Sequence, residues 1–287
     1  ITACSDAFRV TADLGAEMAY PDDTPPYARE PVITGDTDLQ TLARPDPAEP
    51  KSRMADRLRG VSEMARAASG QVAIVGWVDM PFAEACSVCG VTEFMLLMKD
   101  DPARAHRILS LLTRIVTDFG LAQVEAGADV IGAGDAATSL ISSRMYTEFA
   151  LPYEQQVCQA IHDADGLVKL HVCGDTTHLL KKMATCGADL FNVDHMVPLG
   201  EAKKVYAAYG KCIKGNLDPV ADIMQATPEQ CQQKAHACIA IAEGSSYMLS
   251  AGCEIPAETQ DEVFQAFCQA PKTYRRQPDT PSKSNDK

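Results

Sequence analysis

Short apolar runs alternate along this chain with longer segments whose apolar residues recur at helical spacing. The short runs are apolar over most of their length rather than at every second position, which is typical of strands buried on both faces of a parallel sheet. The strands expected on this basis are Val72–Asp79, Asp129–Asp135, Leu167–Cys173, Leu190–Asp194, Cys212–Asn216 and Tyr247–Gly252, and Ile1–Cys4 is a candidate for a further strand.

The segments between these runs have the periodicity of amphipathic helices. We expect helices over Arg53–Ala68, Pro102–Ala126, Met145–Asp163, Thr177–Cys186, Leu199–Tyr209, Pro228–Glu243 and Glu258–Ala270. Thr227 precedes one of them as a helix-capping residue, followed by a proline at the first helical position. The regular alternation of strand and helix predicts the α/β class with a parallel sheet.

Two layouts compete for such an alternation: a doubly wound open sheet and a closed (β/α)8 barrel. No Gly-x-Gly-x-x-Gly follows any expected strand, which removes the main signature of a dinucleotide-binding open sheet. Polar residues stand instead at the carboxyl ends of several strands, where barrel enzymes place their chemistry. We therefore favour a single barrel domain over residues 1–270, with an irregular excursion over its mouth at 21–52 and a disordered tail at 271–287.

Charge and composition exclude some classes of partner. The formal net charge is -13 and the pI is about 4.9, which argues against binding nucleic acid or an anionic membrane surface. No apolar run reaches the ~18 residues of a membrane span, and the first residues lack the features of a signal peptide, so we expect a cytoplasmic protein.

The eleven cysteines are odd in number and indicate no disulfide framework. Most of them fit small hydrophobes on helices. Cys86 and Cys89 form a Cys-x-x-Cys pair with no second pair near it, which is only a weak indication of a redox or zinc role.

The strongest local motif is His171-Val172-Cys173-Gly174. Its histidine and cysteine alternate on one strand, so both side chains point to the same face near the strand's end. Taken alone, they fit half a zinc site as well as they fit a buried pair. Cys253 ends a second expected strand, also beside a glycine, and completes a His/Cys/Cys set with an open fourth position, which is the pattern of a catalytic zinc site. We assign the fourth position to a substrate thiol or water, with Glu254 as the alternative from the protein.

Other polar residues at strand ends extend the candidate site. The candidates for catalysis are Asp79, Asp135, His195 and Glu254, and the candidates for cofactor binding are Asn216 and Asp218. For the aspartates and the asparagine, a helix cap or a loop hydrogen bond is the competing interpretation.

Four segments together resemble the uroporphyrinogen decarboxylase superfamily over nearly the whole chain, to about residue 270. They are His171–Thr176, Gly215–Pro219 (similar to a GN(I/L/V)DP turn), Asp135–Ser143 with Phe149–Tyr153, and Ala251–Pro256. The resemblance implies a (β/α)8 TIM barrel. Members of the family carry further N-terminal helices and a first strand, and this sequence opens at what looks like a later strand. We therefore allow for a barrel that lacks those elements.

The resemblance points to the branch of zinc-dependent, corrinoid-linked methyltransferases, because His171, Cys173 and Cys253 match that branch's zinc motif position by position. It implies Zn²⁺, methylcobalamin or another corrinoid supplied by a partner corrinoid protein, and a small thiol or methylated substrate that exchanges a methyl group with the corrinoid. Asp79, Asp135 and His195 would orient this substrate.

Two other functions remain open. The first is metal-independent uroporphyrinogen decarboxylation, which in the family relies on an arginine-rich N-terminal segment that is not seen here. The second is a zinc-stabilised fragment that binds a corrinoid protein without turnover.

Overall fold

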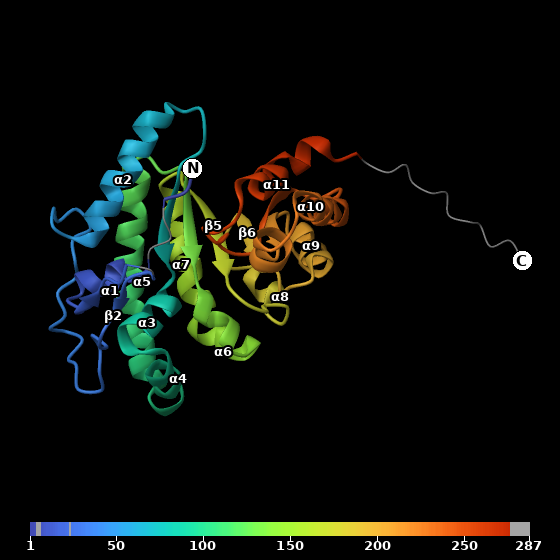
Figure 1. The fold of residues 1–287 in the computed structure, drawn as a ribbon. Coiled ribbons are helices and arrows are strands. Elements are labelled where there is room, and N and C mark those ends of the chain that lie inside the picture. The colour runs from blue at the N-terminus through green and yellow to red at the C-terminus, as the bar shows by residue number, and fades with distance from the viewer. Residues whose placement is uncertain (4–6, 23, 276–287) are drawn as a thin grey trace, which may run out of the picture.

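Six parallel strands form the centre of the molecule, and helices cover the outside of the sheet (Figure 1). The computed structural model describes residues 1–3, 7–22 and 24–275. The strands are β3 (Val75–Asp79), β4 (Val130–Gly134), β5 (Leu167–Val172), β6 (Leu190–Val193), β7 (Cys212–Leu217) and β8 (Tyr247–Ala251), in the order β3-β4-β5-β6-β7-β8. Each of them overlaps a strand expected from the sequence, and every neighbouring pair is parallel. The α/β class with a parallel sheet is therefore confirmed.

The first edge of this sheet carries one further contact. Thr2 makes an isolated parallel bridge to Val75 of β3, where the sequence predicted a strand from residue 1 to residue 4; the last of these residues lies outside the described ranges. Within the described ranges β3 and β8 do not pair with each other, so hydrogen bonds do not close the sheet into a ring. A separate antiparallel pair, β1 (Met18–Ala19) and β2 (Tyr27–Ala28), lies in the early part of the chain.

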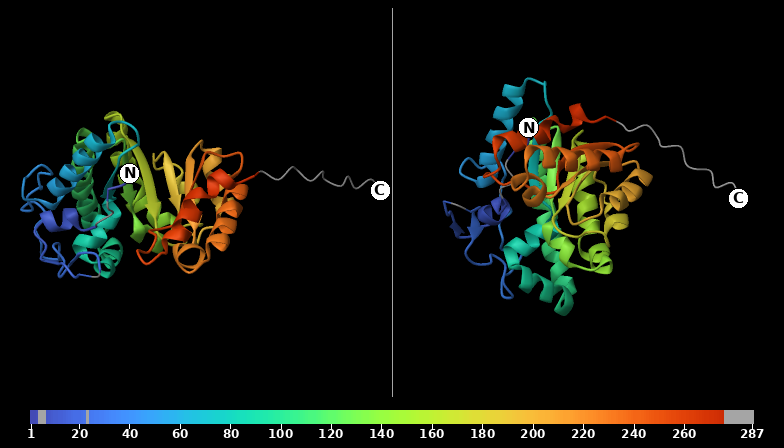
Figure 2. Two further views of the ribbon diagram at one scale, coloured as in Figure 1. Left: turned by 45° about the horizontal axis from the view of Figure 1, so that its top comes forward. Right: turned by 45° about the vertical axis from the view of Figure 1, so that its right-hand side comes forward.

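The helices alternate with the strands along the chain. They are α1 (Arg9–Asp13), α2 (Arg53–Ala68), α3 (Pro81–Cys89), α4 (Val91–Asp100), α5 (Pro102–Glu125), α6 (Ser143–Phe149), α7 (Leu151–Asp163), α8 (Leu180–Met183), α9 (Leu199–Ala208), α10 (Pro228–Ala242) and α11 (Asp261–Thr273). Helices α2 and α5 lie beside the first strands, and α9, α10 and α11 cover the last ones (Figure 2). The expected helices that match α2, α5, α9 and α10 are confirmed to within one residue at each end.

Side-chain caps fix the first turns of these helices. The Ser52 hydroxyl accepts a hydrogen bond from the third residue of α2, and the Asp101 carboxylate does the same for α5. Thr227 forms a reciprocal capping box with Gln230 at the start of α10, as the sequence predicted. The caps satisfy backbone N–H groups that have no partner inside the helix, and so they define where each helix begins.

One expected helix is two in the structure. The segment from Met145 to Asp163 is divided at Ala150 into α6 and α7. Pro152 explains the division, because a proline lacks the backbone N–H that would bond back to the carbonyl of Glu148 and so continue the first helix. Pro152 therefore stands in the first turn of α7, where no such N–H is needed.

The end of the described chain also differs from the expectation. Helix α11 continues through Pro271 to Thr273, past the expected domain boundary at residue 270. The expected disordered tail lies from residue 276 onward outside the described residues, and the single-domain assignment stays a prediction.

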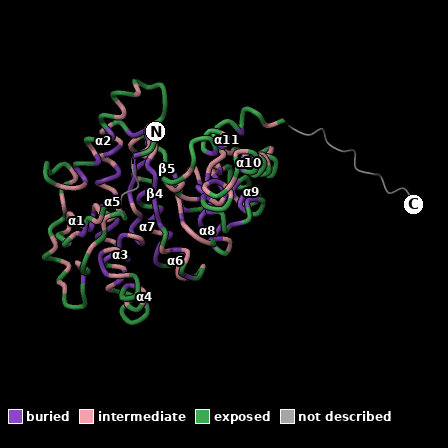
Figure 3. Tube along the Cα trace, viewed as in Figure 1, coloured by how far each residue is buried: buried purple, intermediate pink, exposed green. Residues whose placement is uncertain are grey.

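The core lies between the strands and the inner faces of the helices, where buried residues gather (Figure 3). Tyr146, Tyr206 and Phe82 are among its largest fully buried side chains. Among the described residues no single helix is long and apolar enough to cross a membrane. Helices α3 and α4 reach the required length and hydropathy only when counted together, across a bend of 106°.

Candidate metal centre

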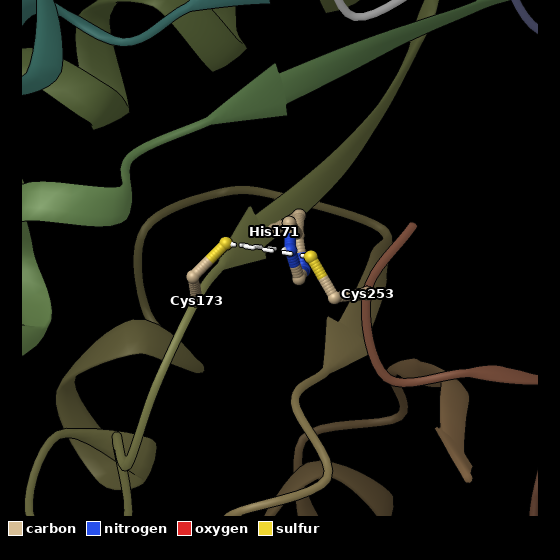
Figure 4. Close-up of side chains that lie close together, drawn as sticks. All are labelled: His171, Cys173 and Cys253. Carbon is tan, nitrogen blue, oxygen red and sulfur yellow. Dashed lines mark hydrogen bonds between the residues drawn. The ribbon is translucent and has the colours of Figure 1, made fainter. Parts of the chain in front are cut away.

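The ends of β5 and β8 bring His171, Cys173 and Cys253 together (Figure 4). One ligand atom from each residue lies within 4.8 Å of the others. The Cys173 Sγ lies 3.2 Å from the His171 Nε2 and 3.7 Å from the Cys253 Sγ. Residues separated by 80 positions in the sequence thus meet at one point, because parallel strands all end at the same edge of the sheet.

These spacings fit a single zinc ion. Zinc binds thiolate sulfur at about 2.3 Å and imidazole nitrogen at about 2.0–2.1 Å with tetrahedral geometry. Those values place two sulfur ligands about 3.8 Å apart, and a nitrogen about 3.6 Å from a sulfur. The sulfur–sulfur spacing found here agrees to about 0.1 Å, and the nitrogen–sulfur spacing is shorter by about 0.4 Å.

The backbone next to the centre fixes which nitrogen of His171 faces the cysteines. Its Nδ1 lies 3.0 Å from the backbone carbonyl oxygen of Asn192, on the neighbouring strand β6. A carbonyl only accepts hydrogen bonds, so Nδ1 carries the proton and Nε2 keeps its lone pair toward the sulfurs. This arrangement of a metal-binding histidine held by a backbone carbonyl orients the ring and makes it a better ligand.

Close backbone packing holds Cys253 in place. A side chain on the preceding Gly252 would lie 2.3 Å from the backbone nitrogen of His195, so only glycine fits there. The Gly252 N–H donates to Leu217 at 2.8 Å, and its carbonyl accepts from the Asn192 side chain at 3.1 Å. The Asn192 residue therefore supports both sides of the centre: its backbone holds His171 and its side chain holds the loop of Cys253.

Electrostatics make the two centre thiols unequal. The hydrogen bond between them lowers the pKa of Cys253 to about 4 and, together with burial, raises the pKa of Cys173. This interaction favours the thiolate form of Cys253, the form in which a cysteine binds a metal. The thiols of the Cys86-x-x-Cys89 pair differ: both are buried on α3, and burial raises the pKa of Cys89 to about 12.

A cavity of about 790 Å³ opens beside the centre. The three candidate ligands line it together with Asp79, Glu254, Trp77, Lys169 and Lys214. Residues 28–31 also line it, from the stretch that the sequence predicted to cross the barrel mouth. The cavity therefore offers a small molecule access to both sulfur atoms and to charged groups of either sign.

Two of the predicted catalytic residues lie in this cavity. Asp79 ends β3, and its carboxylate accepts a hydrogen bond of 3.4 Å from the Trp77 indole. Glu254 follows Cys253 and is exposed, but its carboxylate is not among the ligand atoms that meet within 4.8 Å. The fourth position of the centre is thus not supplied by Glu254 in this arrangement.

Asp135 does not line the cavity, contrary to the role that we expected for it. It is fully buried, and its Oδ1 accepts a hydrogen bond of 2.8 Å from the Ala83 N–H near the start of α3. Burial and the neighbouring Glu154 raise its pKa well above the usual range. Successive residues of a strand point to opposite faces of the sheet. Gly134 faces the Trp77 ring on the inner face, so the next residue, Asp135, points to the outer face.

The remaining predicted residues form a second group at the ends of β6 and β7, outside the cavity lining. The two ring nitrogens of His195 lie 3.2 Å from a carboxylate oxygen of Asp194 and 3.5 Å from one of Asp218. The Asn216 side chain donates to the backbone carbonyls of Asp194 and Val197. Asp218 caps the turn that follows it. All of these contacts stabilise loops, and the proposed contact of Asn216 and Asp218 with a cofactor stays a prediction.

Two lysines of the cavity were not among the predicted site residues. Lys169 is only 7% exposed, and its ammonium lies 4.8 Å from the centre of the Trp77 ring. Burial, followed by repulsion from Lys214, lowers the pKa of Lys169 to about 8. Lys169 has the same strand parity as His171, and this signal was available in the sequence.

Comparison with known proteins agrees with this fold. The family model described as uroporphyrinogen decarboxylase matches residues 1–274. The chain is 29% identical over 246 residues to the methylated-thiol--coenzyme M methyltransferase of Methanosarcina mazei, covering 84% of this chain and 65% of that relative. It is 27% identical over 276 residues to the uroporphyrinogen decarboxylase of Methylobacillus flagellatus, covering 93% and 76%. A solved methyltransferase from Methanosarcina mazei shares the fold with a TM-score of 0.84 at 21% identity, over 95% of this chain and 79% of that one.

Proposed function

We propose that this chain, which belongs to the uroporphyrinogen decarboxylase family, is a zinc-dependent methyltransferase that moves a methyl group between a corrinoid on a partner protein and a small sulfur compound. The observation that carries the proposal is the meeting of one nitrogen and two sulfur atoms at the edge of a cavity, with the sulfur–sulfur spacing of two tetrahedral zinc ligands. Structural zinc sites usually close all four positions with protein, whereas catalytic sites keep one open.

The residues at and around the centre would have different roles. His171, Cys173 and Cys253 would hold the zinc, and Asn192 keeps the lone pair of His171 directed at it. Zinc in such a site supplies Lewis acidity, which lowers the pKa of a bound thiol or polarises a methylated sulfur. Asp79 would orient the sulfur compound, because it lines the same cavity. The curated relative from Methanosarcina mazei is named for a methylated thiol and coenzyme M, which supports a sulfur compound as the substrate.

Metal content tests the centre directly. We expect about one zinc per chain in the purified protein and its loss in Cys253→Ser. Cys268→Ser is the matched control, because Cys268 is exposed on α11 and should leave the zinc in place. Incubation with free methylcobalamin and a small thiol should then yield the methyl thioether in the wild type and in Cys268→Ser only. Equal zinc content in Cys253→Ser and in the wild type would contradict the proposal.

A second candidate function is decarboxylation of uroporphyrinogen without a metal. Lys169 and Lys214 favour it, because they give the cavity positive charges for carboxylates. It is also the named activity of some relatives of this chain. A protein stripped of metal that still decarboxylates uroporphyrinogen, and that keeps this activity in Cys253→Ser, would support this alternative over methyl transfer.

A further inference from the structure

Helix α5 carries a continuous stripe of residues along one side. In chain order the stripe consists of Arg107, Leu111, Arg114, Asp118, Leu121 and Glu125. Residues spaced alternately by four and three positions share one face of a helix, and this stripe extends over about 27 Å. The opposite face of α5, which includes Leu112 and Val116, is buried in the core. The stripe therefore faces away from the sheet.

Two hollows lie along the stripe, between α5 and the irregular segment that precedes α2. The first has a volume of about 550 Å³ and is lined by Arg107 and Arg114, and the second has about 530 Å³ and is lined by Asp118 and Glu125. Arg44 lines both hollows and contacts the Asp118 carboxylate where they meet. Apart from this shared arginine, the charged residues of the first hollow are all basic and those of the second are all acidic.

The order of these charges has no explanation within a single chain. Among the described residues, the exposed side chains of Arg107, Arg114 and Glu125 form no ion pair. Glu125 is also the last residue of α5, where the helix dipole disfavours a carboxylate. A face that holds unpaired charges in two separate groups of opposite sign suits a partner that carries the same groups in reverse order.

We propose that this partner is α5 of a second copy of the chain, packed antiparallel along the stripe in a two-fold symmetric dimer. A two-fold axis that crosses α5 at Val116 reverses the order of the residues on the second helix. Three complementary pairs then face each other: Arg107 with Glu125, Leu111 with Leu121, and Arg114 with Asp118. All three are centred on the same residue, so one alignment forms them together. Each pair occurs twice, because a two-fold interface uses the same surface of both copies.

The hollows fit the same alignment. The basic hollow of one copy lies against the acidic hollow of the other, so that long arginine side chains have space beside the carboxylates. Asp118 would contact Arg44 of its own chain and Arg114 of the second copy. Because the stripe faces away from the sheet, the dimer leaves the metal centre accessible, and the inference does not depend on the proposed function.

Charge reversal tests the pairing. The wild type should dimerise at low ionic strength and dissociate as salt is added, because exposed ion pairs are screened. Arg107→Glu and Glu125→Arg each replace two attractions per dimer by two repulsions, so each variant should raise the dissociation constant about tenfold or more in sedimentation velocity. Lys204→Glu is the matched control, because it makes the same change of charge at an exposed site on α9 and should dimerise as the wild type does.

A mixture of the two variants gives the sharpest result. The Arg107→Glu chain and the Glu125→Arg chain are complementary to each other at both copies of the pair, although neither is complementary to itself. An equimolar mixture should therefore form a heterodimer with about the wild-type affinity, and a chain that carries both substitutions should again form a homodimer. A variant that failed to fold could not recover its partner in this way.

The outcomes decide the proposal. A wild type that sediments as a monomer up to about 0.1 mM overturns it and leaves the stripe to a partner of another kind. A dimer that is equally stable in Arg107→Glu and in the wild type overturns it as well, because such a dimer uses another face. Weakening in both single variants, together with recovery in their mixture, supports the antiparallel α5 interface.

Discussion

Gly252→Ala tests whether close backbone packing sets the position of Cys253. A β-carbon at residue 252 would lie 2.3 Å from the backbone nitrogen of His195 and 3.0 Å from the Asp194 carbonyl carbon. Ordinary van der Waals contact begins at 3.4 Å, so one of the two backbone segments must move by about 1 Å. No flexible side chain can absorb this shift, because the atoms that clash belong to the backbone on both sides.

The shift is large for a metal centre. Zinc–ligand distances vary by about 0.2 Å, and Cys253 is bonded directly to the residue that moves. We expect zinc affinity to fall about 10–100-fold, the range found when the groups that support metal ligands are changed. Overpacking should also lower the free energy of unfolding of the metal-free protein by about 1–3 kcal/mol.

Competition with a chromophoric zinc chelator measures the affinity, and urea unfolding measures the stability. Gly60→Ala is the matched control, because Gly60 lies inside α2 with nothing within 4 Å of an added β-carbon. It should leave zinc affinity unchanged and stabilise the fold by about 1 kcal/mol through helix propensity. Wild-type zinc affinity in Gly252→Ala would refute the argument that the packing of this glycine positions the ligand.

Two further predictions concern the support around the cavity. Gln123→Leu should lower the free energy of unfolding by on the order of 2–4 kcal/mol in urea, because the buried Gln123 side chain bonds both the N–H and the carbonyl of Trp77, at 2.8 and 3.0 Å; a loss below about 1 kcal/mol would be inconsistent with those bonds. Asp135→Asn tests a pH dependence: burial raises the folded-state pKa of Asp135 above its unfolded value, so its contribution to stability is present below the unfolded pKa and is lost as pH rises through the folded one. The stability of Asp135→Asn relative to the wild type should therefore increase between pH 4 and pH 8, and a difference that stays constant with pH would disprove the assignment.

Strands were predictable from the sequence because burial on both faces leaves an uninterrupted apolar run, as in β4 and β5. The helices α2 and α5 were predictable because each has an exposed face and a capping residue. Helices α3 and α4 were not identified. Most residues of α3 are buried on every side, so the polar face that would reveal a helical period is missing.

The site was only partly predictable, because the sequence does not show which face of each strand points into the cavity. The parity of His171 and Cys173 shows that they share a face, and the rule for strand ends brings Cys253 near them. Parity does not show which face is the inner one, so Asp79 and Asp135 looked alike as residues at strand ends. Only the pairing of the strands shows that Asp135 points toward α3 and that Lys214 lies in the row of His171.

The ring of Trp77 occupies the space that two side chains of β4 would otherwise fill. A β-carbon on Gly132 would lie 2.5 Å from the indole, and one on Gly134 would lie 3.1 Å from it and 2.7 Å from the Asp79 carboxylate. Positions 77, 132 and 134 therefore cannot change independently of one another during evolution. A lineage that replaces the tryptophan by a small residue frees both glycines to acquire side chains, and one that gains a side chain at position 132 must first lose the ring. We expect these three positions to vary together among relatives, and with them the shape of the cavity floor on which Lys169 rests.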